Sequence, residues 1–314
     1  MAKKETMKMS LSDDTMLEVS VSRTDNEAVG IVHIFHGMAE HLERYNRLVT
    51  QLNQQGYHVI CHNHRGHGKA INTLRGHFNS IEEVAQDAYE IKTTLQPTIN
   101  KDLPYIVLGH SMGSIIARRF VQLYPNEVDG LILTGSALFS KWKGYPLVLG
   151  TKIISIVTGK KRRLKWMNQL MIGSFNKSFK PTRTLSDWIS SDEHEVDLFI
   201  QDQYTGFLVS NQLIYSVMRT IMKSAQMKEI AKMNPNLPIL LISGKADPFG
   251  ENGKGIRRLG KTLKKGGIHH ITVQLYKQKR HEILFEKDRE TVWRHMLDWM
   301  SRQIIKKKVS ESSE

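Results

Sequence analysis

Short apolar runs alternate with segments of helical periodicity along much of this chain, and this alternation constrains the fold more than any other feature. The runs predicted to be buried strands are residues 29–35, 57–62, 105–108 and 131–134. The segments predicted to be helices are residues 42–55, 81–95 and 114–123. Strands and helices in alternation predict an α/β fold, in which a mostly parallel central sheet carries helices on both faces.

A hairpin precedes this pattern and further elements follow it. Residues 6–11 and 16–23 alternate as strands do, and the polar residues 12–14 form the turn between them. After a long gap, the predicted elements are strands at 238–243 and 270–276 and a closing helix at 286–305.

Residues 140–236, called the insertion below, interrupt the strand–helix pattern. They are rich in Lys, Trp, Met and Ser and contain no strand of the core type. A connection of this length is far longer than an ordinary loop. We therefore expect a mostly helical cap, or lid, over the carboxyl edge of the sheet. Residues 1–139 and 237–305 would form the two parts of the core, and 306–314 a basic, polar tail.

Length and composition suit one large domain with an insertion. The chain has 314 residues, 40% of them hydrophobic, which is enough for a sizeable core. Its single cysteine, Cys61, excludes an internal disulfide. The N-terminus lacks the apolar segment of a signal peptide, and the apolar stretch around 145–158 contains Lys152 and is too short to span a bilayer. These features predict a soluble, cytoplasmic protein.

Positive charge is in excess, with a formal net charge of +14. Such an excess favours contact with anionic surfaces, and peripheral contact with an anionic membrane is one expectation. The alternative is a solvated basic face without a partner. The charges are dispersed apart from small clusters at 160–163 and 306–308, and no nucleic-acid-binding signature accompanies them. No nucleic acid partner is therefore expected.

The segment Gly109-His110-Ser111-Met112-Gly113 matches the pattern G-x-S-x-G. The motif is short, but here it lies between an apolar strand and a helical segment. Ser111 is therefore predicted on a sharp strand-to-helix turn, the position of a nucleophile. The flanking glycines fit because side chains there would collide with neighbouring elements. The alternative is an ordinary serine in a βα-turn.

A serine hydroxyl needs a base, and the base needs an orienting carboxylate. Asp247 follows the strand 238–243, and His281 follows the strand that ends near residue 276. This gives the chain order Ser, Asp, His that such a turn requires. The rival candidates are Glu251 for the carboxylate and His269 or His270 for the base. Both histidines precede the last strand and should lie at the wrong end of the sheet.

Acyl transfer also needs donors for the developing oxyanion. The strand 29–35 runs into a His36-Gly37 turn, which would present backbone N–H groups to the nucleophile. The predicted pair of donors is the backbone amides of Met38 and Met112.

Together these motifs resemble a known family. His36-Gly37-Met38-Ala39-Glu40-His41 with Arg44-Tyr45, His64-Arg65-Gly66-His67-Gly68 and the Ser111 motif are similar to the monoacylglycerol lipase and lysophospholipase branch of the α/β-hydrolases. Within the insertion, the segments similar to bacterial members are Phe175-Asn176-Lys177, Arg183-Thr184, Asp187-Trp188 and Tyr204-Thr205-Gly206-Phe207. The resemblance covers nearly the whole chain.

The resemblance implies the α/β-hydrolase fold and hydrolysis of esters with one long acyl chain, without cofactor or metal. It also implies that Glu40, Arg44 and His110 lie near the polar head of the substrate, whereas the alternative for Glu40 and Arg44 is an ion pair on a helix surface. The chain departs from the family at Asn63, where Asp is frequent, and at Lys69. Met38 replaces a smaller residue, which affects the shape of the pocket but not a backbone donor.

The expected mechanism has two steps through an acyl-enzyme. His281 takes the proton of Ser111, the two amides hold the oxyanion, and water releases the fatty acid. The apolar residues expected to line an acyl tunnel are Leu147, Val148, Leu149, Ile153, Ile154, Met167, Met171 and Phe175. They could instead form the core of the insertion, or meet a membrane beside Lys152 and residues 160–163.

Three other functions remain open from the residues. One is a general carboxylesterase for short-chain esters. Another is a peptidase of the proline iminopeptidase kind, which would need acidic residues in the insertion, such as Glu193 and Glu195, to hold a substrate amine. The third is a non-catalytic binding protein, which would require a broken set of catalytic residues.

Overall fold

The computed structural model describes residues 3–305. An eight-stranded sheet runs through them in the order β1-β2-β4-β3-β5-β6-β7-β8. Its strands are β1 (Lys3–Ser10), β2 (Met16–Arg23), β3 (Gly30–Phe35), β4 (Tyr57–His62), β5 (Tyr105–His110), β6 (Gly130–Thr134), β7 (Ile239–Gly244) and β8 (Ile271–Tyr276). The hairpin β1–β2 and the pair β2–β4 are antiparallel, and every other pair is parallel. The predicted mostly parallel sheet is confirmed.

Helices cover both faces of this sheet. The helices of the core are η1 (Leu42–Tyr45), α1 (Asn46–Gln54), α2 (Ile81–Ile99), α3 (Met112–Leu123), α9 (Lys254–Lys265), η3 (Ile283–Phe285), α10 (Arg289–Met300) and the π-helical turn η4 (Ser301–Ile305). Buried side chains of α2, α3 and α9 pack on one face, and those of α1 and α10 pack on the other. Successive residues of β3, such as Ile31 and Val32, enter opposite clusters because side chains of a strand alternate in direction.

Three details of the core differ from the sequence prediction. The helix predicted at 42–55 begins as the 3₁₀ turn η1, and the helix predicted at 286–305 begins only at Arg289. Helix α9 was not predicted, although Ile256, Leu259 and Leu263 are spaced as one helical face and are all buried. The predicted tail at 306–314, with its lysine cluster, lies outside the described residues.

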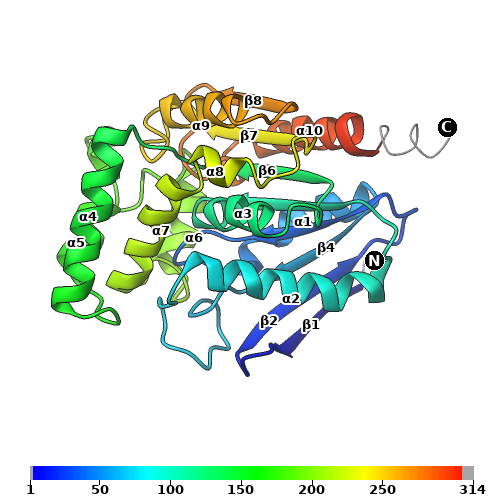
Figure 1. The fold of residues 1–314 in the computed structure, drawn as a ribbon, viewed down its shortest axis with the longest axis horizontal. Coiled ribbons are helices and arrows are strands. Elements are labelled where there is room, and N and C mark those ends of the chain that lie inside the picture. Colours follow the sequence, from blue (N-terminus) through cyan, green and yellow to red (C-terminus); the bar gives the residue numbers. More distant parts are fainter. Residues whose placement is uncertain (1–2, 306–314) are drawn as a thin grey trace.

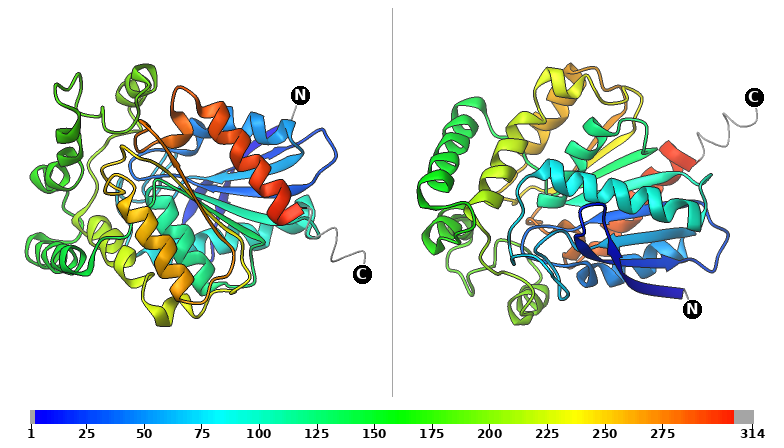
Figure 2. Two further views of the ribbon diagram at one scale, coloured as in Figure 1. Left: turned by 90° about the horizontal axis from the view of Figure 1, so that it is seen from above. Right: turned by 60° about the horizontal axis from the view of Figure 1, so that its bottom comes forward.

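The insertion between β6 and β7 is helical, as predicted. It comprises α4 (Lys141–Thr158), α5 (Lys165–Met171), η2 (Gly173–Phe179), α6 (Glu193–Gln201), α7 (Asn211–Lys223) and α8 (Met227–Ile230). In Figure 1 its green and yellow helices lie on the left, while α10 lies on the right, and both views of Figure 2 keep this separation. None of the helices between residues 3 and 305 combines the length and apolar character needed to cross a membrane.

The turn between β5 and α3 is packed tightly against the end of β3. A Cβ atom added to Gly113 would lie 2.0 Å from the carbonyl oxygen of Phe35, and one added to Gly109 would lie 2.5 Å from that of Gly113. Both neighbours are backbone atoms, which cannot rotate away. Only glycine therefore fits at these positions, as the spacing of the motif predicts.

We expect Gly113→Ala to lower the free energy of unfolding by about 1–3 kcal/mol or more, because the methyl group has no free space. Gly150→Ala is the matched control. Gly150 lies in α4 with no atom within 4 Å of its added Cβ, so alanine there should stabilise by about 0.5–1 kcal/mol. Urea unfolding followed by circular dichroism measures both, and equal effects at the two positions would contradict the packing argument.

Candidate active site

Ser111 lies at the point where β5 turns into α3. Its φ of 51° is in the left-handed region, which residues other than glycine rarely adopt. The Ser111 N–H donates to the carbonyl of Thr134 over 2.9 Å, and its own carbonyl accepts from the Ser114 hydroxyl over 2.6 Å. These bonds hold the turn in its unusual conformation and direct the Ser111 side chain into a cavity.

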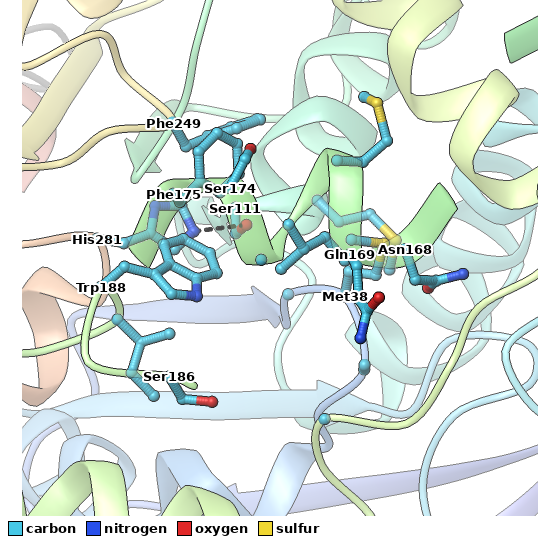
Figure 3. A pocket seen from close by; sticks show the side chains of 18 of the residues that line it. Met38, Ser111, Asn168, Gln169, Ser174, Phe175, Ser186, Trp188, Phe249 and His281 are labelled. Atoms are coloured by element: carbon cyan, nitrogen blue, oxygen red, sulfur yellow. Dashed lines mark hydrogen bonds between the residues drawn. The ribbon is translucent and has the colours of Figure 1, made fainter. Parts of the chain in front are cut away.

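The structure brings Ser111, His281 and Asp247 together. His281 Nε2 lies 2.8 Å from Ser111 Oγ, and His281 Nδ1 lies 3.1 Å from Asp247 Oδ2. Asp247 is fully buried, and its Oδ1 accepts the N–H of Phe249 over 2.9 Å. Such a chain can move a proton from the hydroxyl to the imidazole while the carboxylate holds the ring. Figure 3 shows the bond between Ser111 and His281.

The rival residues lie elsewhere. Glu251 pairs with Lys143 over 2.9 Å and with Arg258 over 2.7 Å rather than with His281. His269 and His270 are exposed and precede β8, and Nδ1 of His269 contacts Asn236. Asp247 and His281, rather than these rivals, are therefore the residues hydrogen-bonded in series with Ser111.

Two backbone N–H groups next to Ser111 are free to bind an oxyanion. Met112 is the first residue of α3, where an N–H has no acceptor within the helix. The Gly37 N–H already donates to the Glu40 carboxylate and is therefore not available to an oxyanion. The next residue of the loop, Met38, lines the cavity. In the part of the chain that the structure describes, neither Met38 nor Met112 has a protein acceptor for its N–H.

The three residues expected near a polar head have different positions. Glu40 and His110 line the cavity, whereas Arg44 does not. His110 Nδ1 lies 3.0 Å from the hydroxyl of Thr134, and burial lowers the pKa of His110 to about 3, so its ring is neutral. Arg44 is instead bound by two carboxylates of the wall, as a buried guanidinium requires, and its role near a polar head stays a prediction.

Arg44 bridges two carboxylates. It binds Glu282 through both terminal nitrogens, at 2.8 and 2.7 Å, and also binds Glu40. Its guanidinium lies 4.5 Å from the ring centre of Phe285. Glu40 also accepts from the Tyr45 hydroxyl over 2.9 Å. The Glu40–Arg44 pair is thus buried rather than a surface pair, and it joins the loop of Met38 to the loop of His281.

The cavity has a volume of about 580 Å³ and a largely apolar wall. Its apolar lining includes Met38, Met112, Leu170, Met171, Ile172, Phe175, Leu185, Trp188, Phe207, Val217, Met218 and Phe249. Of the eight residues expected to line an acyl tunnel, only Met171 and Phe175 do so. The expectation was wrong for Leu147, Val148, Leu149, Ile153 and Ile154, because α4 packs one side on α7 and turns the other to solvent. It was also wrong for Met167 of α5, which is buried in the hydrophobic core.

The acidic residues that a peptidase would need do not reach this cavity. Glu195 is buried against Arg47 at 2.5 Å and Arg289 at 3.1 Å, and the Glu193 side chain is exposed. Between residues 3 and 305, no group of three or more His, Cys, Asp or Glu side chains is arranged to hold a metal ion. Sequence reasoning missed the roles of Glu282 and Trp188 in the wall, although Glu282 directly follows His281.

His281 gives the site a defined pH dependence. Burial alone would lower the pKa of His281, but Asp247, with smaller effects of Glu282 and Glu40, raises it above the ordinary 6.5. The neutral form is the base, so we expect the rate of Ser111 labelling by a fluorophosphonate to fall as the pH drops through a value above 6.5.

Asp247→Asn removes the charge that favours the imidazolium. We expect this variant to move the acid limb to lower pH. We also expect labelling to slow about 10³–10⁴-fold, because the asparagine amide would hold the His281 imidazole in the wrong tautomer. Rates measured from pH 5 to 9 test both effects. An acid limb that does not move in Asp247→Asn would show that another group titrates.

Comparison with known proteins agrees with this geometry. Residues 26–288 match the family described as serine aminopeptidase, S33. A monoacylglycerol lipase of Mycolicibacterium smegmatis is 33% identical over 114 residues, covering 36% of this chain and 40% of that protein. A monoglyceride lipase of Mus musculus is 28% identical over 271 residues, covering 82% of this chain and 80% of that one.

The fold has close counterparts among solved structures. A thermostable carboxyl esterase from Bacillus coagulans, solved with glycerol, superposes with a TM-score of 0.87 at 25% identity, covering 95% of this chain and 98% of the esterase. The resemblance that the sequence motifs suggested is therefore confirmed. The chain belongs to the S33 serine aminopeptidase family of α/β-hydrolases, a family whose relatives include monoglyceride lipases.

Proposed function

We propose that this protein is a serine hydrolase that cleaves carboxylic esters of single-chain lipids, monoacylglycerols or lysophospholipids, through an acyl-enzyme. The observation that carries the proposal is the hydrogen-bonded series Ser111–His281–Asp247 at the wall of a 580 Å³ apolar cavity. A cavity of this size accommodates a long acyl chain but offers few polar groups for a peptide. The names of the lipase relatives support the same substrate class.

The mechanism assigns one role to each residue. Ser111 Oγ attacks the ester carbonyl as His281 Nε2 takes its proton, and the amides of Met38 and Met112 bind the oxyanion. Asp247 holds the imidazole and stabilises its cationic form. His281 then protonates the leaving alcohol, and water activated by the same base releases the fatty acid.

We further propose that the insertion acts as a cap on a core formed by residues 1–139 and 237–305. Both parts contribute to the cavity wall: Phe175 and Trp188 come from the insertion, while Phe249 and Glu282 come from the core. A substrate in the cavity would therefore be enclosed between them, which excludes water from the reacting ester.

The first test combines a probe and a substrate panel. We expect a fluorophosphonate to label the protein and not Ser111→Ala, and we expect that variant to lose at least about 10³-fold in kcat. p-Nitrophenyl esters, monoacylglycerols and lysophospholipids of varied chain length should show a preference for long acyl chains.

Each contrary outcome has its own meaning. Labelling or turnover that survives in Ser111→Ala would remove Ser111 as the nucleophile, whereas a parent protein that is neither labelled nor active on any ester would be a binding protein. Preference for acetate would leave a general carboxylesterase. Release of proline from a proline amide, without cleavage of monoacylglycerol, would identify a peptidase.

The outer face of the insertion supports contact with an anionic membrane. In α4, the exposed apolar residues Trp142, Tyr145, Leu149, Ile153 and Ile156 are three or four positions apart and form one stripe, which Val157, four positions after Ile153, widens. Trp142 and Val157 are 74% and 76% exposed. Leu170 and Leu185 are also exposed, and both line the cavity. The exposed cations Lys152, Lys160, Lys161, Arg162, Arg163 and Lys165 would complement anionic headgroups.

We expect the protein to bind vesicles that contain phosphatidylglycerol more tightly than pure phosphatidylcholine vesicles, and salt to weaken the difference. The double variant Trp142→Ser/Val157→Ser should bind about tenfold more weakly, because two large apolar side chains no longer enter the lipid. Val273→Ser, at an exposed residue of β8, is the control and should bind normally. Vesicle co-sedimentation measures all three, and equal binding to both lipids would contradict the proposal.

A further inference from the structure

A short segment of the insertion lies directly over the imidazole of His281. The ring centres of Trp188 and His281 are 4.8 Å apart, and their planes are inclined by 34°. Two other rings enclose the imidazole, Phe249 at 5.4 Å and His110 at 5.2 Å. Figure 3 shows the indole of Trp188 next to His281. Because His281 is only 3% exposed, water has little access to this ring.

Hydrogen bonds hold this segment on both sides of His281. The Glu282 N–H donates to the carbonyl of Ile189 over 2.6 Å. The Arg280 guanidinium donates to the carbonyls of Asp187 and Ser190, the latter over 3.0 Å.

A buried carboxylate completes the attachment. Glu286 accepts the N–H of Ser191 over 3.1 Å and the N–H of Arg280 over 2.6 Å, and it also binds the Ser191 hydroxyl. Its contacts therefore tie the end of the segment to the residue that precedes His281. The indole is thus fixed over the imidazole rather than resting there by side-chain packing alone.

The charged groups that act on His281 are carboxylates. Asp247 lies in the plane of the ring at Nδ1, and the carboxylates of Glu282 and Glu40 act from further away, where Arg44 neutralises part of their charge. His110 is buried and neutral, and Arg280 turns its guanidinium to the insertion carbonyls and to the Phe179 ring. Of the three rings around the imidazole, Trp188 is the closest and the most nearly parallel to it.

We propose that Trp188 is a positioning residue for the general base: it fixes the plane of the His281 imidazole toward Ser111 and stabilises the imidazolium that forms when the proton moves from Ser111 Oγ to His281 Nε2. The negative face of an aromatic ring attracts a cation within about 6 Å, and indole does so best. Burial strengthens this attraction because no water competes for the charge. The insertion thus contributes to the chemistry as well as to the cavity, an inference that rests on the proposed role of His281.

The test uses the graded series Trp188→Phe and Trp188→Leu, read by the pH dependence of kcat/KM for p-nitrophenyl butyrate. We expect Trp188→Leu to lower the apparent pKa of the acid limb by about one and the plateau about tenfold, with Trp188→Phe between it and the parent protein. A purely structural role would lower the plateau without moving the acid limb. Phe207→Leu is the matched control, because Phe207 lines the same cavity but contacts the ring of His67 instead.

The outcomes separate this inference from the function on which it rests. Turnover that survives in Ser111→Ala would remove the function itself. With turnover dependent on Ser111, an unmoved acid limb in Trp188→Leu, or an equal movement in Phe207→Leu, would overturn the role of Trp188 alone. If Trp188→Leu fails to fold, Trp188→Phe decides: an acid limb at or above the parent value overturns the proposal.

Discussion

The site depends on one close backbone contact, between Gly113 at the start of α3 and the last residue of β3. Because a Cβ atom there would lie 2.0 Å from the Phe35 carbonyl oxygen, the helix can approach the strand end only with glycine. This approach places the N-terminal N–H of α3 beside the loop that begins at His36. The nucleophile turn and the Met38 loop therefore form a single unit, and the cavity wall is built outward from it.

A buried ion triad joins that unit to the loop of His281. Arg44 sits between Glu40 and Glu282, and Glu40 also holds the Gly37 N–H. Burying three charges costs solvation, and the paired geometry offsets that cost. Both carboxylates in the cavity wall, Glu40 and Glu282, are therefore bound to Arg44 rather than free. Such a wall suits an uncharged acyl chain.

The insertion is attached to the core at several places, and two of these attachments have different consequences. Its segment 187–191 is bound around His281, and α8 is bound to α3 through the ion pair between Arg119 and Glu229 at 2.7 Å. Helix α4 packs on α7 and leaves an apolar stripe exposed. The parts that touch the proposed base are thus held firmly, while the stripe remains available for a lipid surface.

The sequence by itself determined the succession of strands and helices along the core, because apolar runs and turn residues act locally. It also predicted that Ser111, Asp247 and His281 meet, because parallel strands share one carboxyl edge. It indicated Glu40 as a partner of Arg44, but not Glu282, the ring over His281, or which side of α4 faces solvent. Glu282 is distant from Arg44 along the chain, and Trp188 is distant from His281. Neither contact leaves a periodic signal in the sequence. A helix that is apolar on several sides, such as α4, has no preferred face until its neighbours pack. Only the tertiary structure decides these contacts, because they depend on how separate segments meet in space.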